Sequence, residues 1–303
     1  MSRDWEATFA VWGQAPSQTQ QDKAENAVRA VRGAIGASTV LSAHDVDVFV
    51  QGSYRNRTNV RQDSDVDICV CYRDAWFADY SMTEGLSREA LGHTIASYGY
   101  AEFKNDLGAA LVNFFGSKSV SRGSKAFDIH ANSYRIDADV VPAFEHRRYH
   151  GNALSNWYTE PTGTEIHPDT GNAIHNWPEQ NYSNGVDKNQ ATGKSFKSTV
   201  RVLKNLRNEM AENGLKAADP IPSYLIECLV WNVANESLNN TTYSADVRGA
   251  LAHLWNNTRE DAECKEWGEI NELKHLFRSS QPWTRAQVNT FLQAAWDYVG
   301  FEG

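Results

Sequence analysis

The chain has 303 residues, a formal net charge of −9 and a sequence pI near 5.5. That length suits one large domain or two modest ones, and the composition is that of an ordinary globular protein. The acidic balance disfavours a duplex nucleic-acid partner, which needs a basic face. No apolar run is long enough to span a bilayer, and the polar N-terminus does not resemble a secretory signal.

The first third of the chain predicts two helices and a strand. Aromatic residues among polar ones in residues 1–16 indicate a short helix or an arm packed on the body. Ser17 to Gly36 predicts a long helix, which Ser17 or Thr19 would cap. Its apolar residues recur at helical spacing: Ala24, Ala27, Val28, Val31, Ala34 and Ile35. Val46 to Val50 then forms an apolar run typical of a buried strand.

The stretch Gln51 to Val70 carries the strongest chemical signal. Gly52 permits a sharp turn and leaves room for a ligand beside the main chain, and Ser53 adds a hydroxyl and an amide that suit phosphate binding. In the strand that follows, Asp65 and Asp67 share one face, because side chains alternate with period two. They lie roughly 6.5–7 Å apart along the strand, a spacing that suits two Mg²⁺ ions about 4 Å apart.

Taken singly, these features have simpler interpretations. A D-x-D pair is common on a solvated strand face, and a Gly-Ser turn alone is a weaker signal still. The order of strand, Gly-Ser, basic loop with Arg55, Arg57 and Arg61, and then a strand with D-x-D is hard to explain by packing alone.

The middle of the chain predicts mixed elements. Arg73 to Tyr80 is expected to be irregular, Ser87 to Tyr98 a helix, Leu107 to Phe115 a short helix or a strand, and Gly116 to Lys125 a polar turn. Two strands should follow, at Ala126 to Ile129 and at Tyr134 to Val141. They offer three further acids, and pattern alone does not choose among Asp128, Asp137 and Asp139.

Gly151 to Gly193 is the least regular segment. It is rich in Asn, Thr, Gly and Pro, and its spaced aromatics are Trp157, Tyr158, Trp177 and Tyr182. A loop this long is usually functional or disordered, and spaced aromatics suit stacking on bases. We therefore expect either a loop over a nucleotide or a packed surface loop, with equal weight. His167 and His175 lack a zinc-like set of partners in the sequence.

The last third predicts helices. Ser195 to Glu212 has a clear apolar face and a basic stripe of Lys197, Arg201 and Lys204, which on its own is usually solvated. Further helices are expected at Pro222 to Asn235, Ser244 to Asn257 and Thr284 to Val299. Thr284 and Gln287 form a capping box for the last of these, and Gly300 ends it.

Gly52-Ser53 followed by Asp65-x-Asp67 resembles the signature of the DNA polymerase β-type nucleotidyltransferases. The run Ala138-Asp139-Val140-Val141-Pro142-Ala143-Phe144 is similar to 2′-5′ oligoadenylate synthases and to bacterial relatives of cyclic GMP-AMP synthase. The sequence of Gln51 to Val70 most resembles those bacterial enzymes, the CD-NTases of anti-phage signalling, and among them the CdnE-like branch. The resemblance covers most of the chain, with its sharp motifs between Gln51 and Tyr224.

The resemblance implies a role for several residues. Asp139 would be the third acid and would bind two Mg²⁺ or Mn²⁺ ions together with Asp65 and Asp67. Triphosphate contacts would come from Lys204, with Lys197 as the second choice, and from the helix start at Ser223-Tyr224, where free amides favour phosphate in any case. Ser223 could instead only cap that helix. Gln51, Gly52 and Ser53 complete the expected nucleotide contacts.

The implied fold is α+β: a polymerase β-like catalytic lobe with a mixed sheet, about residues 1–190, and a helical lobe, residues 191–303, with the active site in the cleft. The implied activity joins ribonucleoside triphosphates into a cyclic di- or trinucleotide, with a lean towards a pyrimidine-containing dinucleotide such as cyclic UMP-AMP. The alternatives are a linear oligonucleotide synthase, a transferase acting on a small molecule or protein, and a silent nucleotide-binding module.

The expected partners are ATP and UTP or GTP, without duplex nucleic acid or membrane. The four cysteines form no zinc pattern, and reduced cysteines favour the cytoplasm. Two further hypotheses are a regulatory partner and conjugation through Gly303 at the C-terminus, a modification known in some relatives.

Overall fold

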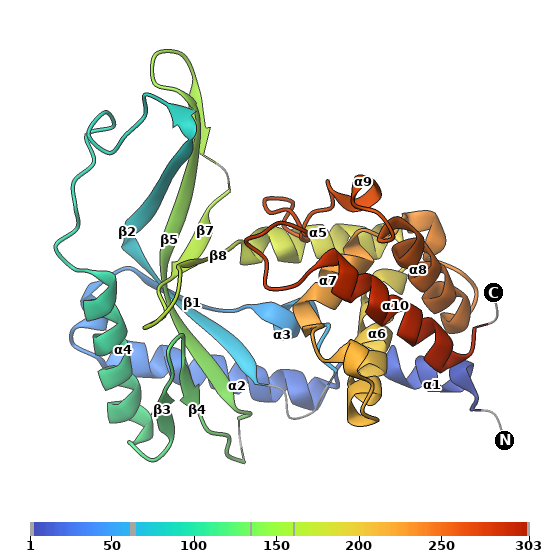
Figure 1. The fold of residues 1–303 in the computed structure, drawn as a ribbon. Coiled ribbons are helices and arrows are strands. Elements are labelled where there is room, and N and C mark those ends of the chain that lie inside the picture. Colours follow the sequence, from blue (N-terminus) through green and yellow to red (C-terminus); the bar gives the residue numbers. More distant parts are fainter. Residues whose placement is uncertain (1–2, 61–64, 134, 160, 302–303) are drawn as a thin grey trace. The chain divides into compact units, whose positions relative to one another are not determined.

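The computed structural model describes residues 3–60, 65–133, 135–159 and 161–301 (Figure 1). The chain forms two compact units: a sheet unit of Ser17–Tyr54 and Gln62–Glu179, and a helical unit of Met1–Pro16, Arg55–Arg61 and Gln180–Gly303. The chain crosses between the units after residues 16, 54, 61 and 179. The single domain boundary near residue 190 stays a prediction. Gly303, the candidate conjugation site, lies outside the described residues, as does Arg61.

The sheet unit is built on one mixed sheet. Its core order is β1-β2-β5-β4-β3; β6 and β7 also pair with β5, and β8 pairs with β7. β2 and β5 run parallel and side by side along their length (Figure 1), and the other pairings are antiparallel. The strands are β1 Val46–Val50, β2 Val66–Glu84, β3 Val120–Arg122, β4 Phe127–Ile129, β5 Ala138–Asn152, β6 Trp157–Thr159, β7 Gly163–Ile166 and β8 Ile174–Asn176.

The two faces of this sheet have different cores. Val66, Ile68 and Val70 of β2 join the larger cluster, which they share with helices α2 (Gln18–Ala37) and α4 (Tyr100–Phe115). Cys69 and Cys71 alternate with them and belong to a smaller cluster. Alternation along β2 therefore turns Asp67 towards the thinly covered face, where a polar group meets less apolar packing.

Helix α2 confirms the periodicity argument. All six apolar residues that predict its inner face are buried, and Ser17 forms a capping box with Gln20. A 3₁₀ turn, Leu41–Ala43, and strand β1 follow. Gly52–Asn56 forms the short helix α3 rather than a plain turn.

Three predictions for the middle of the chain are wrong. Arg73 to Tyr80 belongs to the long strand β2, although its register with β5 shifts after Tyr72. Ser87 to Tyr98 forms turns and irregular structure rather than a helix, and Ile95 within it is 76% exposed. The helix starts instead at Tyr100 and absorbs the ambiguous segment Leu107 to Phe115. Gly116 to Lys125 contains strand β3, which is stabilised by its pairing with β4.

The helical unit confirms most of the predicted helices. Ser195–Glu212 forms α6 with the predicted bounds, whereas α7 stops at Trp231, short of the expected Asn235. The other elements are α1 Trp5–Trp12, α5 Pro178–Ala191, α8 Tyr243–Asn257, α9 Asp261–Cys264, α10 Arg285–Val299 and the 3₁₀ turns Lys216–Ala218 and Asn235–Ser237. Within the described ranges, every helix is too short or too polar to traverse a lipid bilayer.

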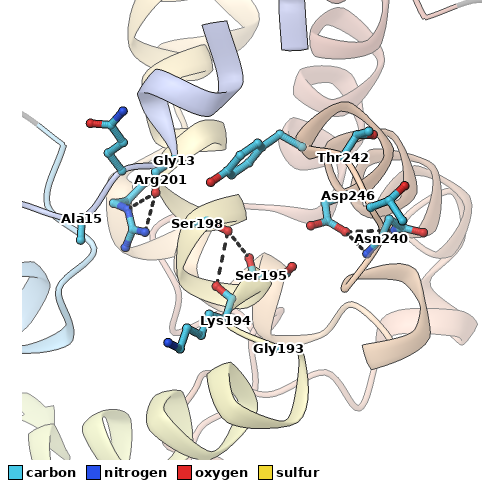
Figure 2. A pocket seen from close by; sticks show the side chains of 13 residues that line it. Gly13, Ala15, Gly193, Lys194, Ser195, Ser198, Arg201, Asn240, Thr242 and Asp246 are labelled. Atoms are coloured by element: carbon cyan, nitrogen blue, oxygen red, sulfur yellow. Dashed lines mark hydrogen bonds between the residues drawn. The ribbon is translucent and has the colours of Figure 1, made fainter. Parts of the chain in front are cut away.

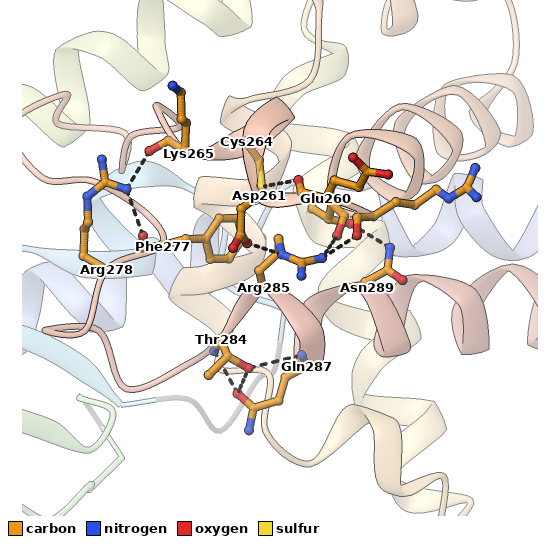
Figure 3. Close-up of polar contacts among 12 residues, drawn as sticks. Glu260, Asp261, Cys264, Lys265, Phe277, Arg278, Thr284, Arg285, Gln287 and Asn289 are labelled. Atoms are coloured by element: carbon orange, nitrogen blue, oxygen red, sulfur yellow. Dashed lines mark hydrogen bonds and ion pairs between the residues drawn. The ribbon is translucent and has the colours of Figure 1, made fainter.

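Helix α10 begins at a dense polar junction, which Figure 3 shows in close-up. Thr284 and Gln287 form the predicted capping box. Arg285 pairs with Asp261 and donates to the main-chain oxygens of Thr258 and Arg259, over 2.6 and 2.7 Å. One side chain therefore holds the end of α8, the start of α9 and the start of α10 together.

Replacing Arg285 by alanine should lower the free energy of unfolding by about 1–2 kcal/mol, because charged hydrogen bonds to main-chain acceptors are lost. The matched control is Arg278→Ala: Arg278 is exposed and donates to the carbonyls of Lys265 and Phe277, so its loss should cost less than about 0.5 kcal/mol. Thermal or urea denaturation measures both. Equal stability of the two variants would refute the bracing role of Arg285.

Candidate functional site

Acidic side chains gather on one face of the sheet where β2, β5 and β4 lie side by side. Asp67 on β2 is the register partner of Asp139 on β5, and Asp139 is also opposite Asp128 on β4. Neighbouring strands of a sheet lie about 4.7–4.9 Å apart, so side chains at partnered positions on one face are close neighbours. Asp65 lies just before β2, two positions from Asp67. The structure therefore brings together the predicted pair and the predicted third acid.

The electrostatics of this face favour a cation. Burial raises the pKa of Asp139, and the charges of Asp65 and Asp128 raise it further, to about 6. Burial also raises the pKa of Asp65, with added repulsion from Asp137 and Asp128. Carboxylates that raise one another's pKa need protons or cations between them. The donor set, carboxylate oxygens only, is the one that Mg²⁺ and Mn²⁺ prefer.

The two rival acids have different surroundings. Asp137 accepts a 2.6 Å hydrogen bond from the main-chain nitrogen of Ala131 and so closes the turn before β5. Asp128 is exposed on the short strand β4 and is opposite Asp139. Local bonding gives Asp137 a structural task, whereas Asp139 faces Asp67 directly. These surroundings favour Asp139 as the third acid, which remains an assignment to be tested by mutation.

Gly52 lies against one of these acids. Its φ is +66°, which favours glycine, and a Cβ built on it would collide with Oδ2 of Asp67. The neighbouring main-chain nitrogen of Gln51 donates to the carbonyl of Asp67 over 2.9 Å. The Gly-Ser turn is thus docked onto the acid-bearing strand, and half-buried Ser53 follows directly in α3.

We expect Gly52→Ala to lower turnover by about 10²-fold, because the added methyl group must displace either the Asp67 carboxylate or the turn. The same substitution at Gly36 is the control. Gly36 lies in α2, and a methyl group added there would meet no atom within 4 Å, so alanine should leave turnover unchanged and the fold slightly more stable. Steady-state pyrophosphate release measures both variants. Unchanged activity of Gly52→Ala would separate the turn from the chemistry.

Lys204, the first choice for the triphosphate, is buried. Only 1% of it is exposed, and its ammonium contacts Glu227 and the carbonyl of Thr58, the latter over 3.1 Å. Thr58 in turn donates to Glu227 over 2.8 Å. Lys204 therefore fixes the segment after α3 to helices α6 and α7. The sequence did not single out Glu227, because nothing local marks a buried glutamate as the partner of a lysine on another helix.

Arg201, one turn before Lys204, is also enclosed. Figure 2 shows its guanidinium directed at the carbonyl of Gly13, which accepts from both Nε and Nη2, and Nη1 donates to the carbonyl of Arg57 over 2.8 Å. Burial lowers the pKa of Arg201 to about 10, with a smaller contribution from the charge of Arg57. The basic stripe on α6 is thus largely internal bracing.

Lys197 is the more accessible lysine of the stripe. It is half-buried, and its ammonium lies 5.8 Å from the ring centre of Tyr182, over which Arg55 also lies at 4.9 Å. Burial lowers the pKa of Lys197, and the charges of Arg201 and Arg57 lower it further. An anion bound nearby would offset this repulsion. Tyr182 and Arg55 could be recognised in the sequence only as members of larger aromatic and basic sets.

The start of α7 carries the remaining predicted contacts. Ser223 is exposed, and no side chain caps this helix. Its hydroxyl accepts a 2.6 Å hydrogen bond from Arg207, so a cation lies beside the helix N-terminus. Tyr224 instead bonds to Glu269 over 2.9 Å, and burial raises its pKa well above the usual range. Ser223 is thus exposed at the start of the helix, whereas Tyr224 is held by a hydrogen bond in the core.

The prediction of a loop at Gly151 to Gly193 is wrong: the segment holds strands β6 to β8 and the whole of α5. Trp177 is fully buried, and the ring of Tyr158 stacks on His150 at 5.0 Å. Trp157 packs on Tyr149, with ring centres 5.8 Å apart. Of the four aromatics, Tyr182 is the one on a helix, beside the basic residues described above.

A sheet with facing acids beside a Gly-Ser turn, together with a helical unit, is the arrangement expected of a nucleotidyltransferase of the CD-NTase class. The family model of the cGAS/DncV-like nucleotidyltransferase C-terminal helical domain matches residues 183–300. The chain belongs to this family and to its CdnE branch, as its relatives show.

Two similar relatives are cyclic dipyrimidine nucleotide synthases named CdnE. That from Legionella pneumophila is 50% identical over 299 residues, which cover 99% of both chains. That from Cecembia lonarensis is 40% identical and covers 99% of this chain and 100% of the relative. The solved structure of the Elizabethkingia meningoseptica CdnE cyclic dinucleotide synthase with GTP and Apcpp is 33% identical, with a TM-score of 0.81 and coverage of 98% and 99%. The chain is therefore an enzyme that transfers nucleotidyl groups.

Proposed function

We propose that the chain condenses two ribonucleoside triphosphates, at least one of them a pyrimidine nucleotide, into a cyclic dinucleotide that signals in anti-phage defence. The main support for this proposal is that Asp67 and Asp139 are register partners on one face of the sheet and that Gly52 packs against Asp67. The pyrimidine preference is supported by the names of the relatives at 50% and 40% identity, both dipyrimidine nucleotide synthases.

Each of the two bond-forming steps has the same balance. The 3′- or 2′-hydroxyl oxygen of one nucleotide attacks the α-phosphorus of another, the bond to the bridging oxygen breaks, and pyrophosphate leaves. The hydroxyl proton passes to a carboxylate, and Asp139, the register partner of Asp67, is the candidate acceptor. Catalysis of this kind consists mostly of positioning and charge stabilisation.

The acids would hold two Mg²⁺ or Mn²⁺ ions, with Asp65 and Asp67 shared by both and Asp139 ligating one. When bound, the ions would polarise the α-phosphate and neutralise the charge on the leaving group. The crowding that raises the pKa values of Asp65 and Asp139 supports this assignment, because bound cations would offset the repulsion.

For the triphosphate we propose Ser53, Lys197 and the α7 start at Ser223, with Gln51 and Gly52 shaping the turn. The enclosure of Lys204 and Tyr224 supports positioning roles for both, in place of the direct contacts that the resemblance implies. Tyr182 offers a partly exposed ring, 37% exposed, for stacking against a base.

The deciding experiment incubates the purified chain with all four ribonucleoside triphosphates and Mg²⁺ or Mn²⁺ and reads the products by mass spectrometry. The expected product resists phosphatase and has the mass of a cyclic dinucleotide with at least one UMP or CMP unit. A purine-only ring would refute the pyrimidine preference, and a linear product would favour an oligonucleotide synthase. Nucleotide binding without pyrophosphate release under both metals would favour a silent binding module.

A further inference from the structure

A second group of metal-ligating side chains lies in the sheet unit, apart from the acids. Glu165 on β7 is the register partner of His175 on β8 and of Phe144 on β5, two residues before His146. Cross-strand pairs and their diagonal neighbours share one face. Three adjacent strands therefore present imidazole, carboxylate and imidazole at the same place.

The atoms of this group converge. Nδ1 of His146 lies 2.7 Å and Nε2 of His175 lies 3.3 Å from the same carboxylate oxygen, Oε2 of Glu165. The two imidazole rings stack with centres 4.2 Å apart. The three ligand atoms all lie within 4.8 Å of one another, and in the described part of the chain no other His, Cys, Asp and Glu set does so.

The surroundings are those of an enclosed cation site. His146 is 1% and Glu165 7% exposed, and the edge of Trp177 packs against His146. Both ring nitrogens, Nδ1 of His146 and Nε2 of His175, face the same carboxylate oxygen of Glu165. A cation bound there would take the place of the protons that they share with this oxygen, because metal ligands bind in their deprotonated forms.

A further histidine completes the arrangement. Nε2 of His167 lies 2.6 Å from Oε1, the other oxygen of Glu165, and its ring stacks on Phe77 at 4.5 Å. A donor that holds the second oxygen of a ligating carboxylate is the usual outer partner of a protein metal site. His167 would thus orient Glu165 and leave Oε2 directed at the two imidazoles.

We infer that His146, Glu165 and His175 form a binding site for one transition-metal cation of the Zn²⁺ type, separate from the nucleotidyl-transfer site. Two imidazoles and a carboxylate are ligands that suit Zn²⁺, and its bonds of about 2.0–2.1 Å to such ligands set neighbouring donors about 3.3 Å apart in a tetrahedron. A fourth position would take water. Bound there, the cation would tie β5, β7 and β8 together.

The site is distinct from the acids by position on the same strand. His146 follows Asp139 by seven residues of β5, a separation of about 23 Å along an extended strand. An odd number of steps also places the two side chains on opposite faces. The ligand types also differ. Because Mg²⁺ prefers oxygen ligands, it should not compete with a softer cation at the histidines.

The test is a titration of the chelator-treated full chain with Co²⁺, and separately with Zn²⁺, in excess Mg²⁺ that occupies the acids. We expect one equivalent of Co²⁺ with the visible absorption of a four-coordinate ion. Zn²⁺ at about 100 times its dissociation constant should raise the melting temperature by about 4 °C. No stoichiometric binding of either ion to the folded chain would overturn the inference.

Variants locate the binding. Glu165→Gln and His175→Gln should each weaken Co²⁺ binding at least 10-fold, and His167→Gln should weaken it about 10–100-fold with the stoichiometry retained. His175 is one-third exposed, so its replacement should leave the fold intact, as circular dichroism would check. His275→Gln, at an exposed histidine of the helical unit, and Asp65→Asn with Asp67→Asn should bind Co²⁺ like the wild type. Undiminished binding by Glu165→Gln and His175→Gln would reject the site.

Discussion

Replacing Asp65 and Asp67 together by asparagine should lower turnover by at least about 10³-fold, because both proposed metal ions lose their shared anionic ligands. The fold should survive. Asp65 is exposed and is repelled by neighbouring acids, so removing charge relieves strain rather than creating it. Pyrophosphate release in Mg²⁺ measures turnover, and circular dichroism with a melting curve measures the fold. Retained turnover in this folded variant would refute the assignment of the site.

Single substitutions then identify the third acid. Asp139→Asn should resemble the double variant, since Asp139 faces Asp67 across the strands. Asp137→Asn is the matched control two residues away. Its new side-chain oxygen can still accept from the nitrogen of Ala131, so turnover should stay within a few fold of the wild type. The reverse outcome would transfer the role to Asp137.

The second large effect is expected on stability. Lys204→Met should lower the free energy of unfolding by about 3–5 kcal/mol, because Glu227, 3% exposed, would lose its buried cationic partner. For a chain of this size that is a fall of about 5–8 °C in melting temperature. Adding Glu227→Gln to Lys204→Met should restore part of the loss, since glutamine can still accept from Thr58.

The variant Lys197→Met distinguishes a lysine that stabilises the fold from one that binds the nucleotide. Burial and neighbouring cations already disfavour the charge on Lys197, so its removal should leave stability nearly unchanged. Because Lys197 is a proposed triphosphate contact, its replacement should instead raise KM for the nucleotides about 10-fold. If Lys204→Met were stable and defective only in nucleotide binding, Lys204 would be the triphosphate lysine that the family resemblance implies.

The features that the sequence predicted well are local ones. The inner face of α2, the bounds of α6 and the capping box at Thr284 follow from spacing over one or two turns. The alternation of Asp65 and Asp67 with Val66 and Ile68 likewise depends only on neighbours, and Val66, Ile68 and Val70 share one buried cluster as expected. Such patterns need no knowledge of the remote chain.

The features that the sequence missed depend on remote partners. The second half of β2, up to Glu84, mixes aromatic and charged residues without alternation, and its pairing with β5 joins residues about 70 positions apart. Strands β6 to β8 are three or four residues long and exist through their pairing. The buried partners of Lys204, Thr58 and Glu227, lie 146 and 23 positions away, so no local pattern marks them. The contact of Lys204 with the triphosphate, which the family resemblance implies, stays a prediction.

The buried cations of α6 also limit how the helical half can be exchanged or excised. The family match begins at residue 183, but Arg201 takes its acceptors from Gly13 and Arg57, and Lys204 takes one from Thr58. In a fragment that begins at residue 183, Arg201 and Lys204 would be buried without these carbonyl acceptors. The helical half therefore cannot be exchanged between relatives on its own. A chimaera would also have to carry the N-terminal arm and the stretch after α3, or its helical half would no longer unfold cooperatively.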